Sequence, residues 1–288
     1  MSGGGLVDQA RAALAKGVRD RIAGPQFQAV HDRIWNSPGP RWFSDGDPIW
    51  RVHADTSMFI GGIRALLLQS LHPVAMLGVS EHSGFRSDPW GRLQRTSRFI
   101  ATTTYGNESD ADRSIAIVRA VHGRVRGTTP SGVPYRADDP HLLAWIHAAE
   151  VDSFLASYQT FGADRLDRDQ TDEYVRQSGW VAEKLGVLDP PQTVAELDAC
   201  LNRFRPELEI SPAAKEAADL LLRDPPLTGP ARLGYRVLAA GACSILPRWA
   251  LNELALPDPL GTSRLVARPI AKSGLSVIRW GLAGGDAV

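Results

Sequence analysis

The chain has 288 residues, 43% of them hydrophobic, which is enough to bury a substantial core without disulfide bonds. Its 32 basic and 32 acidic residues cancel, so no net charge attracts it to nucleic acid or to an anionic membrane. Two widely separated cysteines and an N-terminus without an apolar signal-peptide core favour the reducing environment of the cytoplasm over an exported, disulfide-linked protein.

Residues 1–56 are predicted to form two helices and an ordered loop that cover the outside of the core. The two helical stretches lie between residues 6 and 36 and are separated by Gly24-Pro25. Residues 37–56 are dense in Pro, Gly and Asp but also hold large aromatic side chains, which is typical of an ordered loop rather than a linker.

The most apolar stretch of the chain follows this loop. A helix that begins near Asp55 or Ser57 is apolar nearly all round, so we expect it to be central. Residues 65–80 carry no charge, yet this stretch is shorter than the ~20 apolar residues that span a bilayer. The sequence therefore predicts a buried helix that breaks near His72-Pro73, and no transmembrane segment.

Arg64 lies inside this apolar helix, where a charged group needs a counter-ion or access to water. The ordinary interpretation is a snorkelling arginine whose guanidinium group reaches solvent. The functional alternative is that Arg64 pairs with the carboxylate of a bound ligand.

A further helix is predicted over residues 89–105, with Gly106 as a left-handed stop. Its residues Arg92, Arg95, Thr96 and Phe99 are spaced so that they share one face. A solvated basic face is the ordinary interpretation of this pattern. The alternative is that two guanidinium groups and a hydroxyl converge on a ligand.

The clearest helix is predicted from Asn107 to Gly127, because acidic residues crowd its first turns and basic residues its end. Its apolar stripe comprises Ile115, Val118, Val121 and Val125. His122 falls on this stripe, so its ring should point into the interior. A hydrogen-bonded core histidine is the ordinary interpretation, and a ligand-binding imidazole is the alternative.

The rest of the chain is predicted to be helical. A deeply apolar helix starts at Pro140 with Asp138 or Asp139 as N-cap, and His147 lies within it, either as a core histidine or beside a cofactor. Further helices are expected over residues 167–185, 193–204, 212–222, 229–256 with a break at Pro247, and 265–280. No stretch shows sustained period-two alternation, so the fold class is all-α.

Common catalytic signatures are absent from the sequence. It contains no glycine-rich phosphate loop, dinucleotide fingerprint, nucleophile elbow or His-Glu-x-x-His helix. His141 and His147 are six residues apart on one helix and make a poor metal pair. The residues alone thus indicate a large helical domain with a polar-lined interior.

Several blocks of residues carry a more specific signal: GGIRALLLQSLHPVAMLGVSEHSGF, GRLQRTSRF, VHGRVRG and YRADDPHLLAWIHA. In order and spacing, over about residues 57–162, they closely resemble the family of latex-clearing proteins (rubber oxygenases) and MpaB-type oxygenases. The resemblance implies one helical domain over residues 1–288 with a globin-like core that holds one b-type haem, and covering helices in residues 163–288.

The resemblance also implies roles for particular residues. His122 matches the axial iron ligand, and Arg92, Arg95 and Thr96 match the catalytic block that organises dioxygen on the other side of the haem. Four further residues are implied as cofactor-binding: Arg64 as partner of a haem propionate, His72 either there or as a helix cap, and Tyr135 and His147 as pocket lining.

Two departures from the family pattern bear on the substrate. Arg95 replaces a lysine, and the family's acidic base has no clear counterpart, since Met76 occupies its offset and Glu81 is merely nearby. We therefore expect a haem-dependent oxidoreductase that uses dioxygen on an apolar small molecule, such as the alkene of an isoprenoid or lipid, rather than on rubber.

Two other functions stay open at this point, a non-catalytic haem-binding sensor or carrier and a haem-free helical binding scaffold. No nucleic-acid partner is expected. The apolar terminal helices leave peripheral membrane contact and a homo-oligomer as options.

Overall fold

The structure is a computed structural model, which describes residues 3–22, 24, 27–84, 86–256 and 262–283. The chain is 73% helix and 3% strand, as the all-α prediction requires. The first half contains α1 (Gly3–Ile22), α2 (Phe27–Asn36), α3 (Pro48–Ala54), α4 (Met58–Gln69), α5 (Pro73–His82), α6 (Pro89–Tyr105), α7 (Glu108–His122), β1 (Arg126–Thr128) and β2 (Pro134–Arg136). The second half contains α8 (Pro140–Phe161), α9 (Arg168–Leu185), α10 (Val194–Phe204), η1 (Arg205–Glu207), α11 (Pro212–Leu222), α12 (Gly229–Ser244), α13 (Arg248–Glu253) and α14 (Thr262–Leu282).

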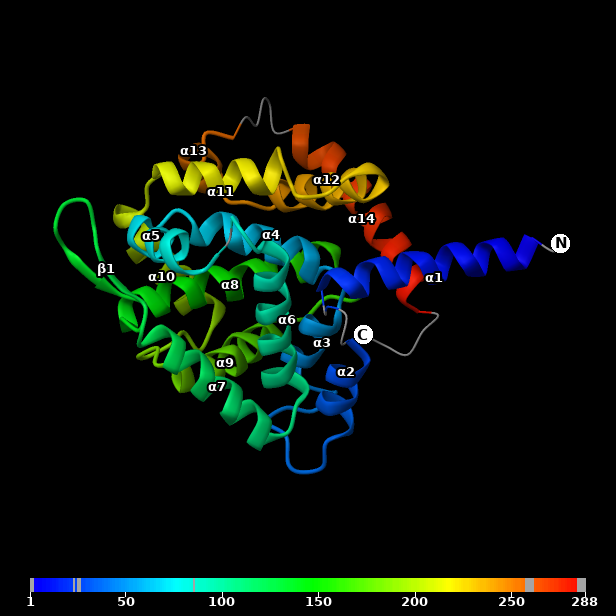
Figure 1. Cartoon of the computed structure of the whole chain (residues 1–288), viewed down its shortest axis with the longest axis horizontal. Coiled ribbons are helices and arrows are strands. Elements are labelled where there is room, and N and C mark those ends of the chain that lie inside the picture. Colours follow the sequence, from blue (N-terminus) through cyan, green and yellow to red (C-terminus); the bar gives the residue numbers. More distant parts are fainter. Residues whose placement is uncertain (1–2, 23, 25–26, 85, 257–261, 284–288) are drawn as a thin grey trace.

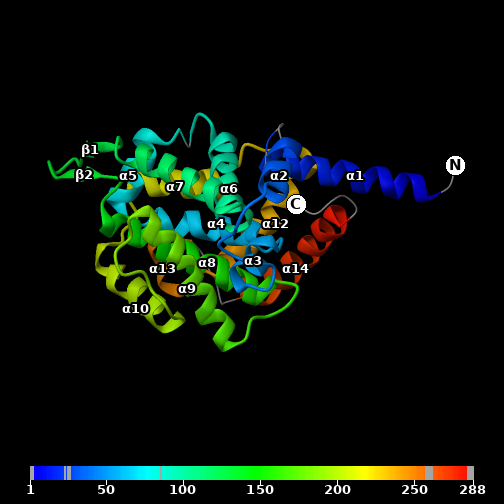
Figure 2. The same cartoon turned by 90° about the horizontal axis from the view of Figure 1, so that it is seen from below.

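Helices α4 and α8 lie side by side at the centre of the molecule (Figures 1 and 2). They approach closely at Gly61, where an added Cβ atom would lie 2.9 Å from the ring of Phe154 and 3.3 Å from its backbone. Ile60, Leu67 and Trp145 are fully buried along this contact. The apolar stretch is therefore central, as predicted, because α8 covers its most apolar face.

The predicted break in the apolar stretch is confirmed. Pro73 begins α5, which is turned by 109° from α4, and the side chain of His72 caps the new helix by accepting a hydrogen bond from the Ala75 amide. No single described helix is both long and apolar enough to cross a membrane, and only α4 and α5 taken together, across their bend, meet that test of length and composition.

The region after α6 differs from the prediction in three respects. Gly106 has φ −75° and is not left-handed, and α7 ends at His122 rather than at Gly127. Gly127 instead belongs to an antiparallel hairpin, where it faces Tyr135, whose ring leaves no room for a Cβ atom. Val121 is 52% exposed, because the buried face of α7 runs through Ala111 and Ile115.

The predicted loop over residues 37–56 contains a helix, α3, that the sequence analysis missed. Pro48 occupies its first turn, and Ile49 and Val52 anchor it in the core. The Gln177 side chain accepts a hydrogen bond from the Ile49 amide at 3.0 Å and donates one to Asp47 at 2.8 Å. A tertiary partner thus stabilises a helix too short to form alone.

The first half of α1 projects from the body of the molecule and is exposed, so only its second half lies against other helices (Figures 1 and 2). Helix α1 packs against α14 and α6 (Figure 2), and the predicted break at Pro247 separates α12 from α13. Residues 257–261, between α13 and α14, lie outside the described residues.

Candidate functional site

Arg64 is buried and fully engaged with its own chain. Only 4% of its side chain is exposed, and its guanidinium group lies 2.7 Å from the Asp152 carboxylate on α8. It also donates to the Ser153 hydroxyl at 2.8 Å and to the Ile245 carbonyl at 3.1 Å. The snorkelling interpretation was therefore wrong, because an aspartate one helix away supplies the counter-ion. A contact with a haem propionate stays a prediction.

His72 caps the start of α5, and Tyr135 contacts Glu81 near the end of the same helix. The ring of His72 is buried, and burial is the main cause of its lowered pKa. Tyr135 is buried on β2 and donates its hydroxyl to Glu81 at 2.5 Å; burial first, and then this carboxylate, raise the pKa of Tyr135 to about 12. Both residues have structural contacts, and their cofactor-binding roles stay predictions.

His122 is the last residue of α7 and lies partly buried. Its Nδ1 atom is buried and has no hydrogen-bond partner among the described residues. Burial lowers the pKa of the ring and outweighs the opposite effect of Asp138, so the imidazole is neutral at physiological pH. A neutral, unsatisfied ring nitrogen is the form in which histidine ligates a metal.

The three residues predicted to organise dioxygen separate into two groups. The guanidinium group of Arg92 is half-buried and donates to the Ser83 hydroxyl at 3.3 Å; burial, and then the charge of Arg95, lower its pKa. Arg95 is largely exposed and pairs with Asp88 at 3.2 Å, and Thr96 is exposed. Only Arg92 of this block therefore faces the protein interior.

His147 and Glu150 lie one turn apart on the same face of α8. The Nε2 atom of His147 is buried without a partner among the described residues, and burial lowers its pKa to about 4. Burial raises the pKa of Glu150 to about 7, although a hydrogen bond with Gln69 opposes the shift. Both side chains nevertheless keep some accessible surface. The shifted pKa values therefore reflect burial among apolar neighbours on α8, and the two side chains are still partly accessible.

A second polar group lies nearby, in the core between α3, α6 and α9. The ring of His53 meets the Thr104 hydroxyl at 2.8 Å and the Tyr174 hydroxyl at 3.4 Å, and burial lowers its pKa to about 3. The charge of Glu150 contributes to the raised pKa of Tyr174, so the two polar groups are electrostatically connected. The interior is therefore polar-lined, as the sequence predicted.

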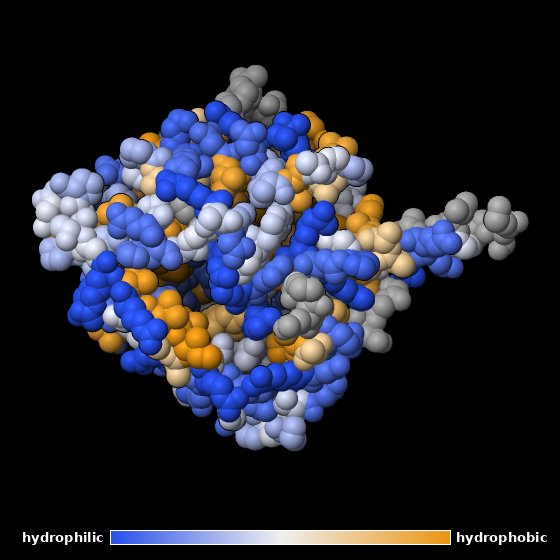
Figure 3. All heavy atoms as spheres, viewed as in Figure 1, coloured by the Kyte–Doolittle hydropathy of each residue, from blue (hydrophilic) through white to orange (hydrophobic). Residues whose placement is uncertain are grey.

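Helices α6 and α7 meet at Gly106 and spread apart toward the ends that carry Arg92 and His122 (Figure 1). Figure 3 shows this face of the molecule hollowed near its centre, beside apolar atoms on the side where α7 lies. Arg92 lies near the start of α6 and His122 is the last residue of α7, so both belong to the diverging ends of these two helices.

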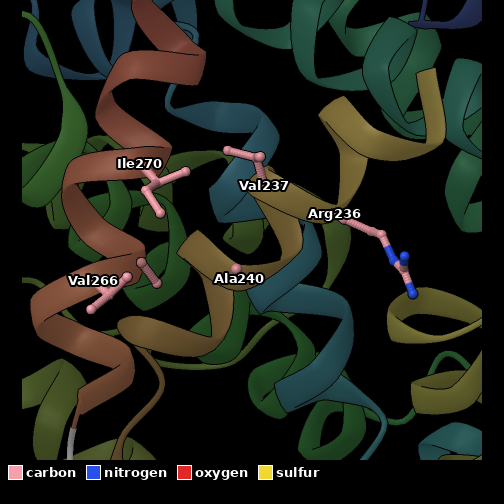
Figure 4. Close-up of a pocket in the computed structure, with 6 residues that line it drawn as sticks. Arg236, Val237, Ala240, Val266 and Ile270 are labelled. Atoms are coloured by element: carbon pink, nitrogen blue, oxygen red, sulfur yellow. The ribbon is translucent and has the colours of Figure 1, made fainter. Parts of the chain in front are cut away.

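Two other hollows are lined by none of the predicted site residues. One of about 630 Å³ lies over the loop between Gly39 and Trp50. The other, of about 340 Å³, lies between α12 and α14 (Figure 4), where Val237, Ala240, Val266 and Ile270 flank the gap and the Arg236 side chain extends away from it.

Three acidic residues with partners in the structure were not predicted from the sequence: Glu150, Asp152 and Glu207. Glu150 interrupts a deeply apolar helix one turn after His147, and this was the available signal for it. Asp152 and Glu207 gave no such signal, because their partners, Arg64 and two histidines, lie far away in the sequence.

The chain shares sequence similarity with a known protein family and with individual proteins. Residues 50–280 match the family model described as "ER-bound oxygenase mpaB/B'/Rubber oxygenase, catalytic domain". An uncharacterized protein of Mycobacterium tuberculosis and one of Mycobacterium bovis are each 34% identical to the chain over 71 residues. These matches cover 25% of this chain and only 28% of the length of each relative. No solved structure matches the chain.

Proposed function

Because the chain belongs to the family of mpaB-type and rubber-oxygenase catalytic domains, we propose that it is a haem b-dependent oxygenase that acts on an apolar small molecule. Membership of an oxygenase family supports the proposed reaction class. The unpaired imidazole of His122 supports haem as the cofactor. A buried ring nitrogen without a partner among the described residues costs free energy of folding unless another group binds it.

The residues at the diverging ends of α6 and α7 fit a haem. His122 would hold the iron through a neutral imidazole at the rigid end of α7, and His147 offers a second orphaned ring nitrogen in the interior. When bound, haem iron supplies the activation of dioxygen that amino-acid side chains lack. The globin-like arrangement of the core and a single domain over residues 1–288 are part of this proposal.

The chain's own contribution is electrostatic. Arg92 stays a cation in a half-buried place, and Arg95, although exposed and paired with Asp88, lies close enough to lower the pKa of Arg92. A half-buried cation such as Arg92 would stabilise negative charge that develops on dioxygen or on an anionic group of the cofactor. Thr96, exposed on the same helix, adds a hydroxyl donor to this proposal.

The substrate class rests on the family and on composition. The buried residues of the core are overwhelmingly apolar, and we propose an isoprenoid or lipid alkene as the substrate rather than a charged molecule. A cytoplasmic location, contact with a membrane surface that delivers such a substrate, and a homo-oligomer are further parts of the proposal.

Absorption spectroscopy of the haem-reconstituted protein tests the axial ligand. We expect one equivalent of haem and a Soret band that His122→Ala shifts or removes, because the iron loses its imidazole. Added free imidazole should restore the band by filling the vacated position. The matched control is His147→Ala, which removes the other orphaned ring and should leave the band in place.

Two results would contradict the assignment of His122 as the axial iron ligand. A Soret band that is unchanged in His122→Ala but lost in His147→Ala would transfer the ligand to α8. A wild-type protein that takes up no haem would remove the cofactor from the proposal altogether.

A further inference from the structure

A cluster of two histidines and a glutamate lies away from the opening between α6 and α7. His72 precedes α5, His141 belongs to the first turn of α8, and Glu207 ends η1. Each residue offers one ligand atom, and the three atoms lie within 4.8 Å of one another. Segments 66 and 69 residues apart in the sequence thus bring together the donor types that divalent transition metals prefer.

The distances within the cluster suit a common ion. The Nε2 atom of His72 lies 3.5 Å from Oε2 of Glu207, and that of His141 lies 2.8 Å from the same oxygen. Two ligands that each lie ~2.1 Å from a tetrahedral zinc ion are about 3.4 Å apart. The first separation is close to this value, and the second opens to it by a rotation of the exposed Glu207 side chain.

His72 gives independent evidence for a ligand. Its side chain is 4% exposed, and its Nε2 atom is buried, is turned toward Glu207 and makes no well-aligned hydrogen bond within the part of the chain that the structure describes. A buried polar nitrogen without a partner is uncommon in a folded protein. His141 and Glu207 are 55% and 42% exposed, so the cluster opens to solvent and an ion can enter.

Aromatic packing fixes the two imidazole rings. The Phe204 ring lies 4.6 Å from that of His141 and 6.3 Å from that of His72, and Trp145 supports both Phe204 and His72. Rings held in this way lose little freedom when they bind an ion, which favours a defined site over loose surface binding.

From these observations we propose that His72, His141 and Glu207 form a binding site for a divalent transition metal of the zinc class. Two imidazoles and one carboxylate leave a fourth position for water, and they disfavour Mg²⁺ and Ca²⁺, which prefer all-oxygen sites. The ion ties the α4–α5 break to the start of α8 and to η1. His141 and Glu207 are not among the predicted haem-binding residues, and only His72 belongs to both sets.

Binding has a defined local consequence at His72. The Ala75 amide now donates to Nδ1 at 3.4 Å, which places the ring proton of the neutral form on Nε2. When a metal binds Nε2, the proton of the neutral ring moves to Nδ1. Nδ1 can then no longer accept the hydrogen bond from the Ala75 amide. The long cap bond is therefore broken on binding, and the Ala75 amide should exchange its hydrogen faster in the metal-bound protein.

Equilibrium dialysis of the tag-free protein with Zn²⁺, and Co²⁺ absorption as a spectroscopic probe, test the site. We expect one equivalent of Zn²⁺ per chain and the visible bands of low-symmetry Co²⁺. Glu207→Gln and His141→Asn should each weaken Zn²⁺ binding by a factor on the order of 10 to 100. Both residues are exposed, so these variants keep the fold, whereas a His72 variant also loses a helix cap.

The control is His82→Asn, which removes an exposed histidine 3.9 Å from a carboxylate but outside the cluster, and should bind Zn²⁺ as the wild type does. Equal binding by wild type, Glu207→Gln and His141→Asn, or binding that falls equally in His82→Asn, would overturn the proposal. Haem uptake should be the same in all these variants, so this test succeeds or fails independently of the haem proposal.

Discussion

Replacement of Arg64 by methionine should lower the free energy of unfolding by about 3 kcal/mol, because it strands the Asp152 carboxylate and the Ile245 carbonyl. Loss of one partner from a buried ion pair costs ~3–5 kcal/mol. We expect the lower end of this range, since the Asp152 side chain is 22% exposed and water partly solvates it. Urea denaturation monitored by circular dichroism measures the change.

A double-mutant cycle separates the ion pair from the packing of its side chains. Asp152→Leu alone should also destabilise the protein, because Arg64 is then buried without a counter-ion. Arg64→Met combined with Asp152→Leu should cost at least ~1 kcal/mol less than the sum of the two single changes. The control is Lys215→Ala, which breaks an exposed pair with Asp219 and should change stability by no more than ~0.5 kcal/mol. Strict additivity in the cycle would show that the pair does not act as a unit.

Replacement of Glu150 by glutamine should stabilise the protein at pH 8 but not at pH 4. Burial raises the pKa of Glu150 from 4.5 to about 7, so the folded protein holds the proton more tightly than the unfolded chain. Below pH 4.5 the carboxyl is protonated in both states and carries no penalty. Between pH 4.5 and 7 the unfolded chain ionises first, and the wild type loses stability as pH rises.

The size of the stability gain follows from the difference between the pKa of Glu150 in the folded protein and in the unfolded chain. A pKa raised from 4.5 to about 7 corresponds to a loss of stability of about 3 kcal/mol, fully developed above pH 7. Glutamine keeps the shape of the side chain and its contact with Gln69 but carries no charge, so the variant should gain up to this amount at pH 8. Urea unfolding curves of both proteins at pH 4, 6 and 8 measure it.

The matched control is Glu253→Gln on α13, an exposed position where the same chemical change should leave the pH profile of stability unchanged. A gain at pH 8 that persists undiminished at pH 4 would mean that glutamine improves packing instead. In that case the carboxyl of Glu150 would not be the group that titrates.

Helical spacing in the sequence predicted the orientation of some site residues better than that of others. His122 was placed on an inward face from helical spacing, and its unsatisfied nitrogen agrees with that placement. The i, i+3, i+4 spacing grouped Arg92 with Arg95 and Thr96, but the structure turns only Arg92 inward. Spacing along a helix fixes which residues share a face, whereas the neighbouring helices decide how wide the buried part of that face is.

The sequence by itself determined the helical class, most helix boundaries, the break at His72-Pro73 and the resemblance to an oxygenase family, because these depend on local pattern and on short blocks of residues. The tertiary structure alone decided the partner of Arg64, the helix within residues 37–56, the titration of Glu150 and the cluster of His72, His141 and Glu207. Each of these depends on groups many residues apart, and the charge, burial and ligation of a side chain are set by whatever the fold places within a few ångströms of it.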